Sequence, residues 1–152
     1  MSEITLRIES PRQADVLRLI EALDVYQAGL YPPESNHFLD MEALAAPGVR
    51  FFVARRDGRA LGCGALRIDP AGYGEVKRMF VSPDARGLKL GRRLLDRIEE
   101  EARRERLGCL RLETGIHQPE ALGLYRAAGY VERDAFGEYS SDPLSVFMEK
   151  SL

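Results

Sequence analysis

The segment VSPDARGLKLGRRLL has the pattern of a phosphate-binding turn, because a strand ending at Val81 passes through a glycine-containing loop directly into a helix. Free backbone N–H groups at a helix start, with the positive end of the helix dipole, favour a pyrophosphate. Arg86 and Arg92 can add charge-assisted contacts. The segment lacks both the GK[ST] ending of a P-loop and the three spaced glycines of a dinucleotide fold. The alternative is an ordinary turn in which Gly87 and Gly91 serve packing.

The sequence does not indicate a metal site. His37 and His117 are its two histidines, and neither has the carboxylate or cysteine spacing that metal ligands require. His117 stands just before Pro119 and is typical of a helix start, whereas His37, in SNHFLD, is a candidate for a binding pocket. Cys63 and Cys109 each lie in an apolar run, which favours buried free thiols over a disulfide and fits a reducing compartment.

The elements that must position these residues begin with an alternating strand at 4–8. Ser10, Pro11 and Gln13 then match a capping box with proline at the first helical position, so a helix is predicted from there to about Ala28. Its apolar face would consist of Val16, Leu17, Ile20 and Leu23.

The middle of the chain predicts a loop and then a β-hairpin. Residues 29–40, GLYPPESNHFLD, contain two prolines and no periodicity, and lead to a short helix near 41–45. Asp57-Gly58 suits the positive φ angles of a two-residue turn. The strands of this segment are predicted at 51–56, 59–68 and 75–81.

Helical periodicity returns after the phosphate loop, with apolar residues from Leu90 to about Leu107 and Gly108 as the stop. The charged residues between them indicate a solvated helix face. A helix at 119–128 and strands at 110–114, 130–133 and 146–150 complete the order β-α-α-β-β-β-α-β-α-β-β. The fold class predicted is α/β, with one mixed sheet flanked by helices.

The composition favours one domain over residues 1–152, since a chain of 152 residues with 45% hydrophobic content can bury a sizeable core. The 22 basic and 24 acidic residues nearly cancel, which gives no overall positive field for nucleic acid. No stretch approaches the ~20 apolar residues of a membrane span, and the N-terminus lacks a signal-peptide pattern. We expect a cytoplasmic protein without nucleic-acid or membrane partners; a homodimer stays open.

The segment ARGLKLGRRLL resembles the acyl-CoA loop of the GNAT superfamily of N-acyltransferases, whose pattern is Gln or Arg, any two residues, Gly, any one, Gly or Ala. Arg86 and Gly91 match its ends, and Lys89 stands where the middle glycine usually lies. QPEALGLYRAAGY is similar to the family's next motif, and the order of elements is the family's. The resemblance implies a GNAT-like acyl-CoA N-acyltransferase fold, in a bacterial subgroup whose acceptors are mostly unassigned.

This resemblance implies that acetyl-CoA is the cosubstrate. Its pantetheine arm would pair with the backbone of Met79, Phe80 and Val81 as an added strand, and Gln118 would contact the same arm. The residues implied to surround the pyrophosphate are Arg86, Gly87, Leu88, Lys89, Leu90, Gly91 and Arg92.

The resemblance also implies the catalytic residues. Tyr125 aligns with the family's general acid and borders the cofactor; a phenol stays protonated at neutral pH and can hydrogen-bond the departing sulfur. Glu75 and Glu113 match glutamates that act as bases in different relatives, and a backbone N–H near Phe80 or Val81 could stabilise the oxyanion. The alternatives are a core aromatic for Tyr125 and solvated or salt-bridged carboxylates for the two glutamates.

The acceptor would lie between GLYPPESNHFLD and EYSSDPLSVFMEK in the family's architecture. These segments offer Tyr31, Glu34, His37 and Tyr139, a polar and slightly acidic set that suits a small cationic amine or an amino acid. We therefore expect acetyl transfer to the primary amine of a small molecule, such as an amino acid or polyamine, without a metal. Two alternatives stay open: acetylation of a protein N-terminus or lysine, and a non-catalytic CoA-binding regulatory module.

Overall fold

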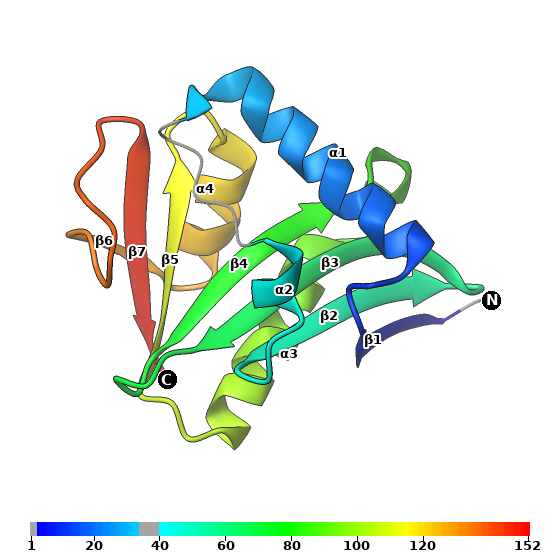
Figure 1. Cartoon of the computed structure of the whole chain (residues 1–152), viewed down its shortest axis with the longest axis horizontal. Coiled ribbons are helices and arrows are strands. Elements are labelled where there is room, and N and C mark those ends of the chain that lie inside the picture. Colours follow the sequence, from blue (N-terminus) through cyan, green and yellow to red (C-terminus); the bar gives the residue numbers. More distant parts are fainter. Residues whose placement is uncertain (1–2, 34–39) are drawn as a thin grey trace.

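The computed structural model describes residues 3–33 and 40–152. Within this part the chain forms one seven-stranded sheet in the order β1-β2-β3-β4-β5-β7-β6, with α1 and α2 on one face and α3 and α4 on the other (Figure 1). The strands are β1 (Ile4–Ile8), β2 (Val49–Arg56), β3 (Arg59–Ile68), β4 (Gly74–Val81), β5 (Cys109–Gly115), β6 (Val131–Arg133) and β7 (Ser145–Ser151). The helices are α1 (Ala14–Leu30), α2 (Met41–Leu44), the 3₁₀ helix η2 (Pro83–Ala85), α3 (Leu90–Arg104) and α4 (Pro119–Ala127). The predicted mixed α/β sheet flanked by helices is confirmed.

The alternation of side chains along β2 divides the core into two layers. Phe52 packs on the face covered by α3, in a cluster with Leu94 and Ile98. Phe51 packs on the opposite face with Val16 of α1 and Leu44 of α2. Each face of the sheet therefore has its own layer of helices.

The start of α1 differs from the prediction. The helix begins at Ala14 after Gln13, which makes no side-chain cap hydrogen bond, so the capping box expected at Ser10 is wrong. The physical reason lies outside the segment: the Arg55 guanidinium hydrogen-bonds Glu9, Gln13 and Asp15 at 3.0, 3.2 and 2.6 Å. This contact with β2 keeps the residues before the helix extended.

Two further helix predictions need correction. The buried face of α1 contains Leu19 rather than Leu17, which is 36% exposed at the edge of that face. The helix predicted to run to Leu107 ends at Arg104, because Arg106 takes a left-handed φ of 60° and the Leu107 N–H bonds back to the Ala102 carbonyl at 3.0 Å.

The hairpin and the thiols follow the sequence more closely. Asp57 and Gly58 have φ angles of 54° and 77°, as the predicted two-residue turn requires. Cys63 and Cys109 are both free; Cys63 is fully buried, whereas Cys109 is only half-buried. In the described part of the chain, no helix has the length and apolar character needed to cross a bilayer.

A bulge in β4 separates it from β5. Ala65 of β3 pairs with Lys77 and Cys63 pairs with Phe80, so two residues of β4, Arg78 and Met79, lie opposite one residue of β3. That residue is Gly64, and Met79 Sδ lies 2.6 Å from where a Cβ at position 64 would be.

The pairing of β4 with β5 is short and parallel. It covers only Gly74 to Val76 of β4 and ends where Val76 lies opposite Leu112. Beyond the bulge the two strands diverge (Figure 1). The sheet is therefore open between neighbouring strands near its middle.

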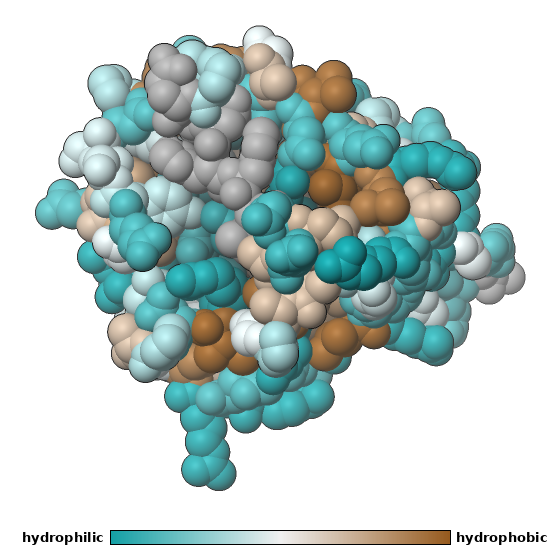
Figure 2. Space-filling model, viewed as in Figure 1, coloured by the Kyte–Doolittle hydropathy of each residue, from teal (hydrophilic) through white to brown (hydrophobic). Residues whose placement is uncertain are grey.

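The surface seen in Figure 2 is mainly hydrophilic, and its apolar residues lie in small separate groups. The exposed apolar side chains of the molecule include Val25 and Tyr26 of α1 and Val131 of β6. Single exposed apolar side chains are normal on a soluble domain.

Candidate active site

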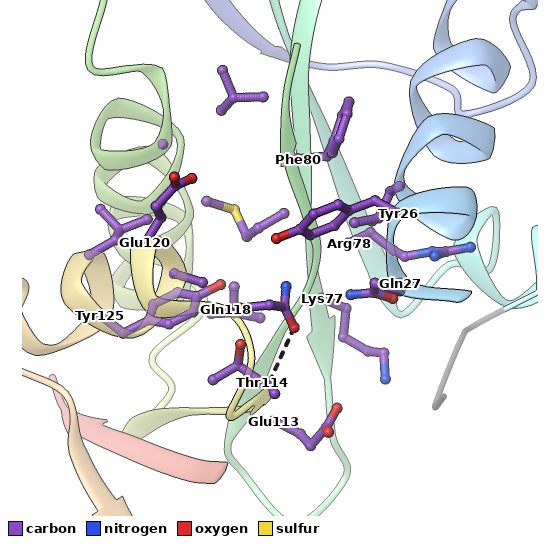
Figure 3. Close-up of a pocket in the computed structure, with 18 of the residues that line it drawn as sticks. Tyr26, Gln27, Lys77, Arg78, Phe80, Glu113, Thr114, Gln118, Glu120 and Tyr125 are labelled. Atoms are coloured by element: carbon purple, nitrogen blue, oxygen red, sulfur yellow. Dashed lines mark hydrogen bonds between the residues drawn. The ribbon is translucent and has the colours of Figure 1, made fainter. Parts of the chain in front are cut away.

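A cavity of about 450 Å³ lies where β4 and β5 diverge (Figure 3). On one face of the sheet it is lined by Tyr26 of α1 and by Tyr31, the residue that follows this helix, and on the other face by Gly91 of α3 and Tyr125 of α4. Two ligands can therefore meet in the opening from opposite faces of the sheet.

The predicted phosphate loop forms the turn between η2 and α3. Gly87 has a φ of 85°, and Lys89, with a φ of 55°, is the N-cap residue of α3. No side chain caps this helix, and Arg86 and Gly91 line the cavity. The uncapped helix start beside an arginine fits the pyrophosphate of acetyl-CoA.

The side chains within this loop have separate roles. Leu90 is buried in the core with Leu88 packed against it. Arg92 was expected to add charge at the phosphate, but its Nε lies 3.0 Å from Asp96 Oδ1 and its Nη1 donates to the Ala127 carbonyl at 3.4 Å. A contact between the Arg92 guanidinium and a phosphate would therefore have to replace these two hydrogen bonds.

Met79, Phe80 and Val81 line the cavity with a strand edge that β5 does not use. On their other side Phe80 and Val81 pair with Cys63 and Gly62 of β3. An open strand edge fits an extended chain that carries amides, such as the pantetheine arm.

Tyr125 lies on α4 with its ring buried, edge-to-face against Tyr130 at 5.8 Å between centroids. It lines the cavity, and no hydrogen bond to another described residue engages its hydroxyl. Burial, and to a lesser degree the charge of Glu113, raise the pKa of Tyr125. The phenol therefore stays protonated and can donate a hydrogen bond into the cavity.

Glu75 is buried within a network of polar side chains. Its carboxylate accepts a hydrogen bond of 2.5 Å from the Tyr139 hydroxyl and pairs with Lys77 at 3.4 Å and Arg67 at 3.7 Å. The Lys77 ammonium also donates to the Tyr139 hydroxyl at 2.8 Å. Burial and the Glu75 charge raise the pKa of Tyr139, so this phenol remains the donor.

Glu113 of β5 is half-buried and points into the same cavity (Figure 3). It accepts a hydrogen bond of 2.8 Å from the Ser145 hydroxyl. Its charge contributes to the raised pKa values of Tyr31, Tyr125 and Tyr139.

Two of the four residues proposed from sequence for acceptor binding, Tyr31 and Tyr139, lie in the described part of the chain. Tyr31 lines the cavity, but its hydroxyl bonds to Gln118 and to the His117 backbone. Tyr139 is not a lining residue and reaches the cavity through Glu75 and Lys77, to which its hydroxyl bonds. His117 stands two residues before the first residue of α4 and stacks on the Tyr31 ring. Glu34 and His37 lie outside the described residues.

Sequence reasoning missed several cavity residues, among them the basic residues Lys77 and Arg78. Arg78 takes a left-handed φ of 58° in the bulge, and its guanidinium pairs with Asp24 of α1. The available signal was the pair of adjacent basic residues within the strand EVKRMFV, whose following residues are all apolar.

Comparison with known proteins identifies the same family that the sequence motifs resemble. Residues 16–130 match the model of the acetyltransferase (GNAT) family, and the chain belongs to this family. It is 57% identical over 153 residues to a protein of Azospirillum brasilense named IAA acetyltransferase, covering 100% of both chains.

Two solved structures have the same fold. A Klebsiella pneumoniae protein described as an acyl-CoA N-acyltransferase is 42% identical, with a TM-score of 0.82 over 100% of this chain and 98% of its own. The PaiA N-acetyltransferase of Thermoplasma acidophilum, solved with coenzyme A, has a TM-score of 0.73 at 21% identity over 99% of each chain. The protein is an acetyl-CoA-dependent N-acetyltransferase.

The left-handed backbone at Lys89 leads to a stability prediction. A side chain in this conformation costs about 1 kcal/mol that glycine avoids, so Lys89→Gly should have a higher free energy of unfolding than Lys89→Ala by about that amount. Urea denaturation measures the difference. Arg93 is the matched control, because it lies inside α3, where glycine should instead be the less stable variant. Equal stability of Lys89→Gly and Lys89→Ala would contradict the argument.

Proposed function

We propose that the protein transfers the acetyl group of acetyl-CoA to the primary amine of a small molecule, with an amino acid favoured over a polyamine. The supporting observation is the opening between β4 and β5, with an uncapped helix start at one side and both carboxylates and cations at the other. Glu75 and Glu113 suit an ammonium group, but Lys77 and Arg78 disfavour an acceptor that carries only positive charge.

Acetyl-CoA supplies the acetyl group as a thioester. Two segments at the cavity share the binding of this cosubstrate. The loop Gly87–Gly91 holds the pyrophosphate through backbone N–H groups, with Arg86 adding charge. The open edge of Met79–Val81 hydrogen-bonds the amides of the pantetheine arm.

Glu113 is the better-supported base of the two candidates. Glu75 already accepts a hydrogen bond from Tyr139 and pairs with Lys77 and Arg67, so a proton taken up by Glu75 would have to weaken these contacts. Glu113 is less buried, lines the cavity, and accepts a hydrogen bond from Ser145. It therefore takes the proton that converts the bound ammonium into an attacking amine, and passes it to solvent.

The remaining steps use Tyr125 and the strand edge. A carbon–nitrogen bond forms as the amine attacks the thioester carbonyl, and a backbone N–H near Phe80 or Val81 stabilises the oxygen that gains negative charge. The carbon–sulfur bond then breaks, and Tyr125 gives the departing sulfur its proton. The second proton lost by the amine restores the phenol.

Release of free thiol from acetyl-CoA tests the function. The assay uses a panel of amino acids, polyamines, peptide amines and IAA, after which the Azospirillum relative is named. Thiol should appear only when an acceptor is present, with the highest kcat/KM for a small amine that also carries an anionic group. Turnover confined to peptides would favour a protein acceptor, and CoA binding with no turnover would favour a regulatory module.

Glu113→Gln should lower kcat/KM by about 10²-fold at low pH, where the acceptor is protonated and a base is needed most. The deficit should shrink as the pH rises, because the free amine then forms without help. Glu75→Gln is the matched control, and it should slow the enzyme by a factor that does not vary with pH. It should also lower the melting temperature, because Lys77 loses its buried partner. An unchanged shape of the pH–rate profile in Glu113→Gln would exclude Glu113 as the base.

Tyr125→Phe should lower kcat by about 10²-fold, or about 2.7 kcal/mol of transition-state stabilisation, if the phenol protonates the sulfur. The variant keeps the ring and its packing on Tyr130, so the melting temperature and the affinity for CoA should change little. Single-turnover measurement of acetyl transfer avoids a limit set by product release. A lower melting temperature with normal turnover would instead indicate a purely structural aromatic residue.

A further inference from the structure

Tyr31 closes one end of the cavity through a set of hydrogen bonds with the segment between β5 and α4. Its hydroxyl donates to Gln118 Oε1 at 3.2 Å and accepts from the His117 backbone N–H at 3.1 Å. Its ring stacks on His117 with 5.6 Å between centroids, and the side chain is only 8% exposed. These contacts join the end of α1 to the start of α4.

The glycine at position 115 provides the space for this contact. A Cβ added to Gly115 would lie 1.7 Å from the Tyr31 hydroxyl oxygen, so the hydroxyl occupies the space of a side chain at 115. The Gly115 N–H in turn donates to Gln118 Oε1 at 3.2 Å. Tyr31 and Gly115 thus bind the same oxygen of Gln118.

These two donors determine which way the Gln118 amide points. A backbone N–H can only donate, so the atom of Gln118 that faces Gly115 must be the carbonyl oxygen. The amide nitrogen is then turned away from the bond with Gly115, as Figure 3 shows. Gln118 lines the cavity, and it presents a donor there.

We propose that Tyr31 is a positioning residue for acetyl-CoA: it holds Gln118 so that its amide N–H donates to a carbonyl of the pantetheine arm. This differs from the acceptor contact expected from sequence, since the Tyr31 hydroxyl is used by Gln118 and His117. The inference rests on the proposed function for its ligand, and it links the α1 side of the opening to cofactor binding.

The test compares binding of acetyl-CoA with binding of adenosine 3′,5′-bisphosphate, which lacks the pantetheine arm, by calorimetry. Tyr31→Phe keeps the ring on His117 but removes the hydroxyl, and it should weaken acetyl-CoA binding about three- to tenfold. Binding of the bisphosphate should stay within about twofold of wild type, because loss of one hydrogen bond to the arm does not reach the phosphate loop. An equal loss for both ligands would overturn the proposal by indicating general loosening.

A double-mutant cycle with Gln118→Met tests whether Tyr31 acts through Gln118. The double variant should bind acetyl-CoA no more weakly than Gln118→Met alone, since the group that Tyr31 orients is already gone. Additive losses would overturn the proposal. So would unchanged acetyl-CoA affinity in Tyr31→Phe together with a raised KM for the acceptor, which would make Tyr31 an acceptor residue.

Gly115→Ala perturbs the same contact from the other side and guards against a fold defect specific to Tyr31→Phe. Its Cβ would meet the Tyr31 hydroxyl and the ring carbons beside it, so the whole side chain should be displaced from Gln118, with the same selective loss of acetyl-CoA affinity. Melting temperatures are measured on each variant. The outcomes for the two proposals are distinguishable. Wild-type binding of acetyl-CoA without turnover on any acceptor would overturn the proposed function alone, whereas failure of wild type to bind acetyl-CoA would overturn both.

Discussion

The bulge at Arg78 and Met79 is the constraint on which the candidate site depends. Without the extra residue, β4 would keep its register with β3 and remain in line to pair with β5 along its length. The bulge imposes two constraints on the chain. Arg78 must adopt a left-handed backbone conformation, and position 64 must lack a side chain so that Met79 has room. In return the sheet opens near its middle, and a strand edge becomes available to an extended ligand. The ion pair of Arg78 with Asp24 fastens α1 beside that opening.

The two carboxylates at the opening, those of Glu75 and Glu113, differ in burial and in the groups that surround them. Tyr139, Lys77 and Arg67 surround Glu75, so loss of this buried carboxylate would remove a partner from all three. Glu113 is half-buried and touches the same space. Two glutamates that sequence reasoning treats as equivalent are therefore separated by their surroundings.

Local patterns predicted most of the fold, because period-two and helical spacing, turn glycines and the loop before α3 depend on neighbouring residues. Two of the failures have tertiary causes. Arg55 is 40 residues from Asp15 in sequence, so no local rule could foresee that it holds the segment before α1 extended. The bulge was equally invisible, since its register is set by pairing with β3. Lys77 and Arg78 were missed for that reason, and the partners of Tyr31 lie 86 and 87 residues away.

A chain with a formal net charge of −2 must attract a polyanionic cofactor by local means. The topology provides them. β4 and β5 are parallel, so their carboxyl ends lie at the same edge of the sheet, and each strand leads into a helix that starts there, α3 after β4 and α4 after β5. Neither helix has a side-chain cap, which leaves backbone N–H groups and the positive ends of both dipoles directed at the opening. Arg86 beside α3 adds a full positive charge at the phosphate loop, although the protein as a whole carries the same sign of charge as its cofactor.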